Sequence, residues 1–490
     1  MKNQRFKSIT CALLVTTMLC SIGCQASATT ASTLESSSTI QVTQKTKNAQ
    51  AAKIPKQQGA GQNQGSKYTL EQAMSDNAQL STIAFSGLAF ITGSEGTYTF
   101  MPPGKVADFF GFQYMRDVDV AGYGHNTQFL TRAASNVLFI LNDAQKQKLA
   151  TLAKSQAPIY TSFAYNRFPI MDAFHQSLKG KAGLSQTAVA EYTANLYKHD
   201  AQLSYERAVV LGEIINSFTD QQIAYFAKME FNNFNTWPDV PEETTLKQGM
   251  TNTEFTAVMT YASELFSWYK GSLAADIYFC PERHGTYFGG FFMKDYPAMN
   301  NPDYFISTAV TGDKGKEFLN ILNDQQRKLI EDIIPQQKEA LAEITKIRTN
   351  VSTELRKAQT GGTIDKEMVY TLIERYGYLD GEISALYAQR FSQVNASLTS
   401  EQRAALVKLR DLEVVPTGAY MFSKEIPMPE IPNVDYMFGN GGYIPENAGH
   451  YPVPAGFEPV SGQNKNSQQK PPKAAGKNSP KGIAQGESQN

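Results

Sequence analysis

Two small groups of side chains in this sequence could bind a metal ion or move a proton. Cys280, Glu282 and His284 place a thiol, a carboxylate and an imidazole within five residues. That donor set suits a soft metal ion such as zinc or copper, or a reactive thiol. His199 and Glu206 are seven residues apart, a spacing that puts both on one face of a helix. Each group also fits a plainer role, as a buried cysteine with surface neighbours or as a satisfied polar pair between helices.

Other catalytic signatures are absent from the sequence. The chain has five histidines, and none belongs to an HExxH or a Glu-x-x-His pattern. It has no G-x-S-x-G elbow, no phosphate-binding glycine loop and no dinucleotide fingerprint. The net charge is −1, so no global charge recruits nucleic acid. The sequence therefore favours a non-enzymatic binding protein.

One five-residue pattern occurs four times along the chain. Each copy has an apolar residue, then Asn or Thr, and ends in Gln, and the copies are 141–145, 218–222, 322–326 and 398–402. The spacing from the first copy to the second differs by a single position from the spacing between the third and the fourth. Two pairs with almost equal spacing indicate one helical module that is present twice.

Each copy predicts the start of a helix. The Asn or Thr would be the N-cap, and its side chain would accept a hydrogen bond from the backbone N–H three residues on. The Gln would reach back to the N-cap N–H, which completes a capping box, and the preceding apolar residue would fold onto the first turn. The residues in these three roles are Leu141, Asn142 and Gln145; Phe218, Thr219 and Gln222; Leu322, Asn323 and Gln326; and Leu398, Thr399 and Gln402.

Helical periodicity follows the capping boxes. In the second module, one apolar face runs from residue 341 to 355 and another from 372 to 386, with a break at Gly361-Gly362. Such spacing of three and four residues is typical of packed antiparallel helices. No stretch alternates apolar and polar residues between hairpin turns. The predicted fold is therefore mainly α, with two tandem helical-hairpin or bundle modules.

The sequences of the two modules can be aligned with each other without a gap along their second helix. In this alignment, His199 and Glu206 stand where the second module has Leu379 and Leu386. Both positions are polar in the first module and apolar in the second. For this reason we consider His199 and Glu206 as a metal, ligand or proton site.

The first residues are typical of an export signal. Residues 1–23 combine a positively charged start with an apolar run that is too short to span a bilayer. The stretch from Ser21 to Cys24 resembles a lipobox, with Ser where Leu is usual, and predicts that Cys24 is lipidated. The alternative is cleavage after Ala28 at an A-x-A site, which gives a signal of residues 1–28. Both interpretations predict export to the periplasmic face of a bacterial envelope, and the first adds a lipid anchor in the membrane.

Composition divides the rest of the chain. A polar Ser-, Thr- and Gln-rich stretch predicts a disordered linker, and a Pro-, Gly- and Asn-rich stretch predicts a largely disordered tail. Between them, each module begins with an aromatic- and glycine-rich insert, 67–108 or 231–286, that is predicted to be irregular. The predicted regions are the linker 24–66, the first module 67–230, the second module 231–412 and the tail 413–490.

The paired capping boxes resemble the LTXXQ motifs of the Spy/CpxP-type periplasmic proteins, which carry two such motifs per chain at a similar spacing. Residues 218–222 and 398–402 match best, and Asn142 and Asn323 put another good N-cap in place of Thr. The resemblance covers about half of the chain. It implies an all-helical fold, because the typical subunit of that family is a hairpin-like unit that dimerises into a curved cradle.

The resemblance also implies a function. Members of this family are ATP-independent chaperones or envelope-stress accessory proteins, and some relatives bind metal. This chain would then be two such units fused as a pseudo-dimer, roughly residues 105–230 and 285–412, which holds unfolded or partly folded envelope proteins. A metal- or small-ligand-binding envelope sensor and a structural envelope protein are alternatives on the same scaffold. Two chains could also pair as a homodimer.

Overall fold

The computed structural model is mainly helical, which confirms the predicted fold class. The residues that it describes are 76–92, 128–230, 236–241, 243, 245–270, 311–409, 428–439 and 443–457. Within these ranges, no helix combines the length and the apolar character that crossing a membrane requires.

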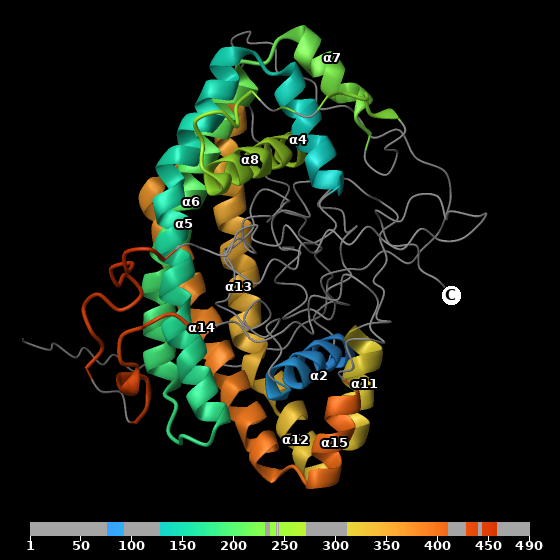
Figure 1. Cartoon of the computed structure of the whole chain (residues 1–490), viewed down its shortest axis with the longest axis vertical. Helices are drawn as coiled ribbons and strands as arrows, with labels where there is room; N and C mark the ends of the chain where they lie inside the picture. Colours follow the sequence, from blue (N-terminus) through green and yellow to red (C-terminus); the bar gives the residue numbers. More distant parts are fainter. Residues whose placement is uncertain are drawn as a thin grey trace, which may run out of the picture. The chain divides into compact units, whose positions relative to one another are not determined.

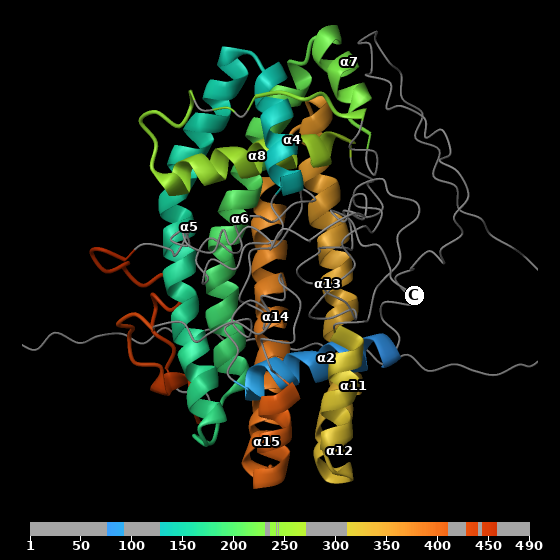
Figure 2. The same cartoon turned by 45° about the vertical axis from the view of Figure 1, so that its right-hand side comes forward.

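Four long helices lie side by side in the order α5, α6, α14 and α13 (Figure 2). Their bounds are α5 Asp143–Leu178, α6 Gln186–Asn216, α13 Ile333–Arg356 and α14 Lys366–Ser397. Gly180 and Gly183, both with positive φ, lie in the turn between α5 and α6. The 3-10 helix η4 (Lys357–Thr360) and the left-handed Gly361 turn the chain between α13 and α14. Each module therefore contributes one helical hairpin.

The apolar faces predicted for the second module are buried between its helices. On α13 the residues of the predicted face are all at most 4% exposed, and they are Leu341, Ile344, Ile347, Val351 and Leu355. On α14 the buried residues of the predicted face are Tyr376, Leu379, Ile383 and Leu386. Full burial of one such aliphatic side chain contributes about 1.5–3 kcal/mol. These two faces therefore hold the second hairpin together, as their periodicity predicts.

The two hairpins join along α6 and α14, which run antiparallel. Thr193 lies opposite Gly381, and the ring of Tyr205 lies 6.3 Å from that of Tyr370. A Cβ atom at Gly381 would come within 2.6 Å of the Thr193 hydroxyl, so this close backbone approach requires glycine. The contact makes one continuous layer of helices from the two modules.

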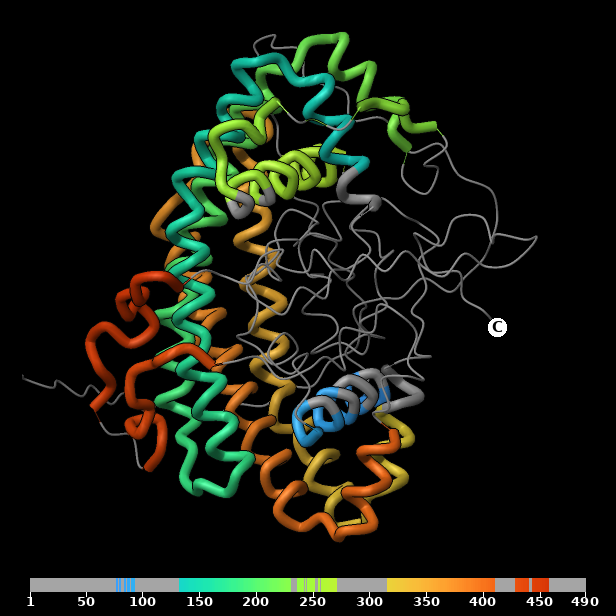
Figure 3. The backbone as a smooth tube through the Cα atoms, in the orientation of Figure 1, coloured from blue at the N-terminus to red at the C-terminus, as the bar shows by residue number. Residues whose placement is uncertain are grey.

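Shorter helices pack at the two ends of this layer (Figures 1 and 3). At one end are α4 (Gln128–Ile140), α7 (Asp220–Lys228) and α8 (Asn252–Lys270). At the other end are α2 (Asp76–Ile91), α11 (Thr311–Ile321), α12 (Asp324–Glu331) and α15 (Ser400–Leu409). Helix α12 leads into α13 at Asp332, and Pro335 lies in the first turn of α13, where its missing N–H costs little. Together α12 and α13 correspond to the single helix α5.

Helices α2 and α8 lie in the inserts that begin the first and the second module, and each packs on the other module. Helix α2 contacts α11, α12, α13 and α14. A Cβ atom at Gly87 of α2 would meet the rings of Phe391 and Phe318 at 3.0 and 3.2 Å. Helix α8 contacts α4, α5 and α6. The two modules therefore exchange their first helices. Chain order predicts instead that each insert packs against the module that follows it.

The composition of the inserts predicts irregular structure, but residues 76–91 and 252–270 are helical. Helix α8 begins at a capping box with Glu in place of Gln. The N–H of Thr251 donates to Glu254 Oε2 at 2.7 Å, and the N–H of Glu254 donates to Thr251 Oγ1 at 3.2 Å. Helix α2 carries apolar residues around much of its circumference, so it lacks the one-sided periodicity that marks a surface helix. Burial against the other module selects its helical form.

Two C-terminal pieces, residues 428–439 and 443–457, lie on α5 and α6, and we call them together the strap. The strap contains the 3-10 helix η6 (Asp435–Met437), and Phe438 forms a single antiparallel bridge with Leu184. Met437 and Ala448 are fully buried. The strap is thus ordered, although the composition of residues 413–490 predicts a largely disordered tail.

Candidate functional site

All four predicted capping boxes form. In each, the N-cap side chain accepts from the backbone of the Gln, and the Gln Oε1 accepts from the N-cap backbone. The two distances are 2.9 and 3.0 Å for Asn142 with Gln145, 3.3 and 3.0 Å for Thr219 with Gln222, 2.9 and 2.9 Å for Asn323 with Gln326, and 3.2 and 3.0 Å for Thr399 with Gln402. The motif therefore starts α5, α7, α12 and α15, as the sequence predicts.

The glutamines of each pair also bond to each other, and we call this arrangement a glutamine clasp. In the first clasp, Gln222 Nε2 donates to Gln145 Oε1 at 2.6 Å, and the reverse contact is 3.3 Å. In the second clasp, Gln402 Nε2 donates to Gln326 Oε1 at 2.7 Å, and the reverse contact is 3.1 Å. Each clasp ties the start of a hairpin to the helix that follows the hairpin. This explains the nearly equal spacing, because both hairpins must return the chain to its starting point.

The spare amide hydrogens of the clasps also have partners. Gln145 donates to the Ser217 hydroxyl at 2.9 Å, and Gln326 donates to the Ser397 hydroxyl at 3.1 Å. Gln222 and Gln402 donate to the backbone carbonyls that end α4 and α11, at 3.0 and 2.9 Å. Because buried amides are costly when unpaired, the complete pairing indicates a structural role for the motif.

A buried ion pair joins α8 to the first module. Arg207 of α6 donates to Glu264 of α8 at 2.9 Å, and the two side chains are 1% and 0% exposed. Arg207 also donates to the Tyr160 hydroxyl, and its guanidinium lies 4.7 Å from the centre of the Tyr261 ring. Burial, the largest single effect, would lower the pKa of Arg207, but Glu264 together with Tyr160, Tyr261 and Asp200 outweighs it and holds this pKa above its usual range. The guanidinium therefore stays charged, and the ion pair links α8 to α6.

The second module uses neutral groups in the corresponding place. Gln337 of α13 donates to Gln79 of α2 at 2.7 Å and accepts from the Tyr387 hydroxyl at 2.6 Å. Tyr387 takes the place of Arg207 in the alignment that sets Leu379 opposite His199. The exchanged helices are thus anchored by polar contacts at both ends of the layer, by an ion pair at one end and by amide and hydroxyl groups at the other.

His199 is the predicted site residue with the most distinctive surroundings. It lies on α6 with 9% of its surface exposed, under the strap. The centres of the His199 and His450 rings are 4.1 Å apart, and His199 Nε2 lies 3.3 Å from the Ser162 hydroxyl. His450 Nε2 lies 2.7 Å from the carbonyl of Asn195, which can only accept, so this nitrogen carries a proton. The structure thus pairs His199 with a histidine from the strap.

Both histidines of this pair are held in the neutral form. Burial, and then the neighbouring His450, lower the pKa of His199 from 6.5 to about 3, while a hydrogen bond to the Gly449 backbone acts in the opposite direction. Loss of water around the ring also lowers the pKa of His450, and the charge of Lys198 adds to this, against the bond to Asn195. The two rings therefore tolerate close contact near neutral pH, and acid would charge them.

Glu206 does not join His199. It accepts from Gln156 at 3.1 Å and from Gln202 at 2.9 Å, about two helical turns further along α6. The described part of the chain holds no group of three His, Cys, Asp or Glu side chains that could bind a metal ion. Cys280, Glu282, His284 and the proposed lipidation site Cys24 lie outside the described residues, so metal binding at residues 280–284 stays a prediction.

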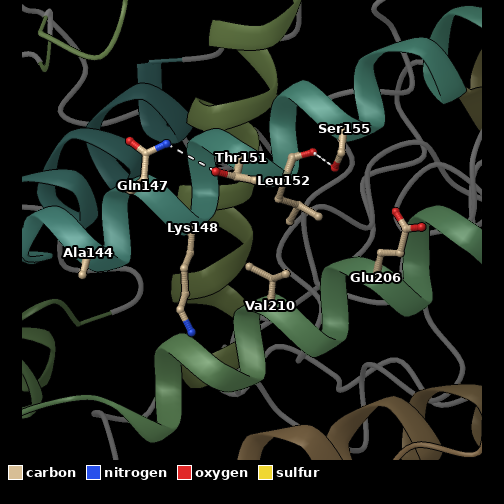
Figure 4. A pocket seen from close by; sticks show the side chains of 8 residues that line it. All are labelled: Ala144, Gln147, Lys148, Thr151, Leu152, Ser155, Glu206 and Val210. Carbon is tan, nitrogen blue, oxygen red and sulfur yellow. Dashed lines mark hydrogen bonds between the residues drawn. The ribbon is translucent and has the colours of Figure 1, made fainter.

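Glu206 instead lines a surface depression of about 520 Å³ between α5 and α6 (Figure 4). Leu152 and Val210 give it an apolar floor, and Lys148 at its rim pairs with Glu213 at 2.5 Å. The other lining residues are Ala144, Gln147, Thr151 and Ser155. Hydrogen bonds to partners outside the depression already hold Glu206, and the lining offers neither a nucleophile–base pair nor a metal-binding set.

Sequence reasoning missed Asn166 and His450, the two residues that connect the strap most directly to the hairpin. Asn166 is one of many polar residues in its helix, with no pattern that distinguishes it, and His450 lies in a segment whose composition predicts disorder. Only their placement in space gives them a role.

Comparison of the chain with protein-family models, with curated proteins and with solved structures finds no match.

Proposed function

We propose that this chain is an exported binding protein that holds unfolded or partly folded envelope proteins without ATP, and that it consists of two fused LTXXQ-type units. The observation that carries the proposal is the pair of glutamine clasps, which close two equivalent hairpins joined along α6 and α14. In the family that the motifs resemble, a hairpin-like unit pairs with a second copy. Here the duplication supplies both units in one polypeptide.

Exposed apolar side chains lie near both clasps. Among the described residues, the large hydrophobic side chains that are exposed are Phe139 at 54%, Val407 at 72% and Tyr443 at 80%. Phe139 lies at the end of α4, two residues before Leu141, which begins the first capping motif, and its ring lies 6.1 Å from that of Tyr225 on α7. Val407 lies on α15, the helix that carries Gln402 of the second clasp. Small apolar contacts at two ends suit weak binding that releases a client without nucleotide hydrolysis.

The experiment that tests this proposal is the aggregation of a chemically denatured client protein, followed by light scattering. We expect the purified full chain to suppress aggregation at a near-stoichiometric ratio in the absence of ATP. If several unrelated clients aggregate equally with and without the chain, the clasps mark only shared architecture and the proposed activity is wrong.

A pair of surface variants locates the activity. The double variant Phe139→Ser with Val407→Ser removes exposed apolar side chains that contribute little to the core, so we expect it to keep its thermal stability and lose most of its protection of the client. A matched control is Gln147→Ser with Gln325→Ser, which changes two exposed polar side chains. This control should behave like the original chain in both measurements.

A further inference from the structure

The strap is held on α5 and α6 largely through its main chain. Asn166 Oδ1 accepts from the N–H of Tyr451 at 2.7 Å, and Asn166 Nδ2 donates to the carbonyl of Tyr451 at 3.1 Å. Both bonds are buried, and Asn166 is fully buried. One amide side chain therefore satisfies both backbone groups of a strap residue, as a neighbouring β-strand would. Such a contact recognises the backbone of a residue whatever its side chain.

Further main-chain bonds continue along the same face. The Tyr165 hydroxyl donates to the carbonyl of Glu430 at 3.0 Å. In the turn between α5 and α6, the N–H of Ser185 donates to the carbonyl of Met437 at 2.8 Å, and the N–H of Gly439 donates to the carbonyl of Gly183 at 2.6 Å. Backbone recognition therefore extends over both pieces of the strap.

A small number of side chains add selectivity. Gly449, at φ +83°, lies so close to α6 that a Cβ atom there would meet the Leu196 nitrogen at 2.8 Å. Tyr451, two residues later, is 7% exposed. Phe457 packs edge-on against Tyr165, with ring centres 5.3 Å apart. The face thus accepts a glycine against α6 and an aromatic side chain two residues after it.

The second module lacks this acceptor face. When the two modules are aligned on their first capping boxes, 141–145 and 322–326, Ile347 takes the place of Asn166. In the same alignment Ser162 stands opposite Glu343, and in the alignment that sets His199 opposite Leu379, Asn195 stands opposite Arg375. Glu343 and Arg375 form a two-pronged ion pair at 2.8 Å. That surface is solvated and has no buried amide aimed at a peptide. Each chain therefore has one acceptor face of this kind in its described part.

We propose that the face of α5 and α6 around Asn166 is a binding site for polypeptide segments that turn at a glycine and carry an aromatic residue two positions later, and that residues 443–457 occupy it in cis. The external occupant, a segment of a client protein with this Gly-x-aromatic pattern, rests on the proposed function. Between residues 443 and 457 the strap forms only short turns, at 446–449 and 455–456, and no helix or ladder, so its contacts with this face supply most of what holds it in place. A client segment with the same pattern competes for the same bonds.

The test uses the full chain and a fluorescent synthetic peptide of residues 443–457, followed by anisotropy. Gly449→Ala places a methyl group against the α6 backbone and should undock the strap, which frees the site for the peptide. The matched control is Gly456→Ala, which also has φ +83° but nothing within 4 Å of the added Cβ atom. Since a tethered strap acts at an effective concentration on the order of millimolar, we expect at least about 100-fold weaker peptide binding to the original chain than to Gly449→Ala.

Two further measurements test the docking of the strap and the role of Asn166. Hydrogen exchange at the Tyr451 amide should lose protection in Gly449→Ala and keep it in Gly456→Ala, and adding Asn166→Ala to Gly449→Ala should abolish peptide binding. Three results would overturn the proposal. They are protection of the Tyr451 amide that is retained in Gly449→Ala, a failure of the peptide to bind once that protection is lost, and peptide binding that survives the loss of Asn166.

The same samples separate this proposal from the proposed function. In the light-scattering assay, peptide binding without suppression of client aggregation would leave the acceptor site in place and reject the chaperone activity. Suppression of aggregation without peptide binding would reject only the acceptor site.

Discussion

Acidification should loosen the strap because His199 is buried in its neutral form beneath it. The pKa of His199 is lowered from 6.5 to about 3, first by burial and then by His450. When the strap leaves, the ring meets water and its pKa returns to about 6.5. The released state then binds a proton more readily than the docked state, so docking is fully stable above pH of about 6.5 and weakens as the pH falls toward 3.

The magnitude follows from the size of this shift. A pH of about 5 lies about 1.5 units below the pKa of the released ring, and each unit is worth about 1.36 kcal/mol. Protonation therefore stabilises the released state relative to the docked state by about 2 kcal/mol. That corresponds to roughly a 30-fold change in the docking equilibrium. His450 acts in the same direction, since its pKa is also lowered. The tyrosines near the pair are Tyr192, Tyr436 and Tyr451, and burial raises the pKa of each, so they stay neutral between pH of about 5 and 7.5. The charge of Lys198 contributes to the lowered pKa of His450.

The assay is hydrogen exchange at the Tyr451 amide, expressed as a protection factor to remove the intrinsic effect of pH. We expect protection to fall roughly 30-fold between pH of about 7.5 and 5 in the original chain. The control is His199→Leu, which places at this position the residue that the second module carries at Leu379. Most of the pH dependence should disappear in this variant. Equal losses of protection in both proteins, or no loss in the original chain, would refute the role of His199.

Three other perturbations have definite expected results. Glu264→Gln leaves a buried arginine without its charged partner and should lower the free energy of unfolding in urea by about 3–5 kcal/mol. The control Glu213→Gln, in an exposed pair, should lower it by less than about 1 kcal/mol. Similar losses for both variants would contradict the buried ion pair. Gln326→Leu should cost about 1–3 kcal/mol by breaking a clasp, and exposed Gln325→Leu should cost almost nothing in the same thermal melts. In a bacterial host, radiolabelled fatty acid should be incorporated into the chain and be lost in Cys24→Ala; an unlabelled chain that begins after Ala28 would favour ordinary signal cleavage.

The candidate site was only partly predictable from the sequence. His199 could be selected because it replaces an apolar residue of the other module, and the structure indeed surrounds it with unusual polar contacts. Its expected neighbour Glu206 bonds elsewhere, because sharing a helix face does not bring residues seven apart into contact. Its actual neighbour His450 lies far away in the chain, in the strap, where no local pattern indicates contact.

The four helix starts, the two hairpins and their buried faces follow from local sequence patterns. Each of these depends on residues three to seven positions apart, such as Asn142 and Gln145, whose geometry the helix itself sets. Three other features come from packing between distant parts of the chain: the glutamines bond to each other, α2 and α8 exchange modules, and the strap covers His199. Those contacts join groups that are distant in the chain, and which of many apolar or polar surfaces pair is settled by burial and hydrogen-bond satisfaction over the whole assembly of helices.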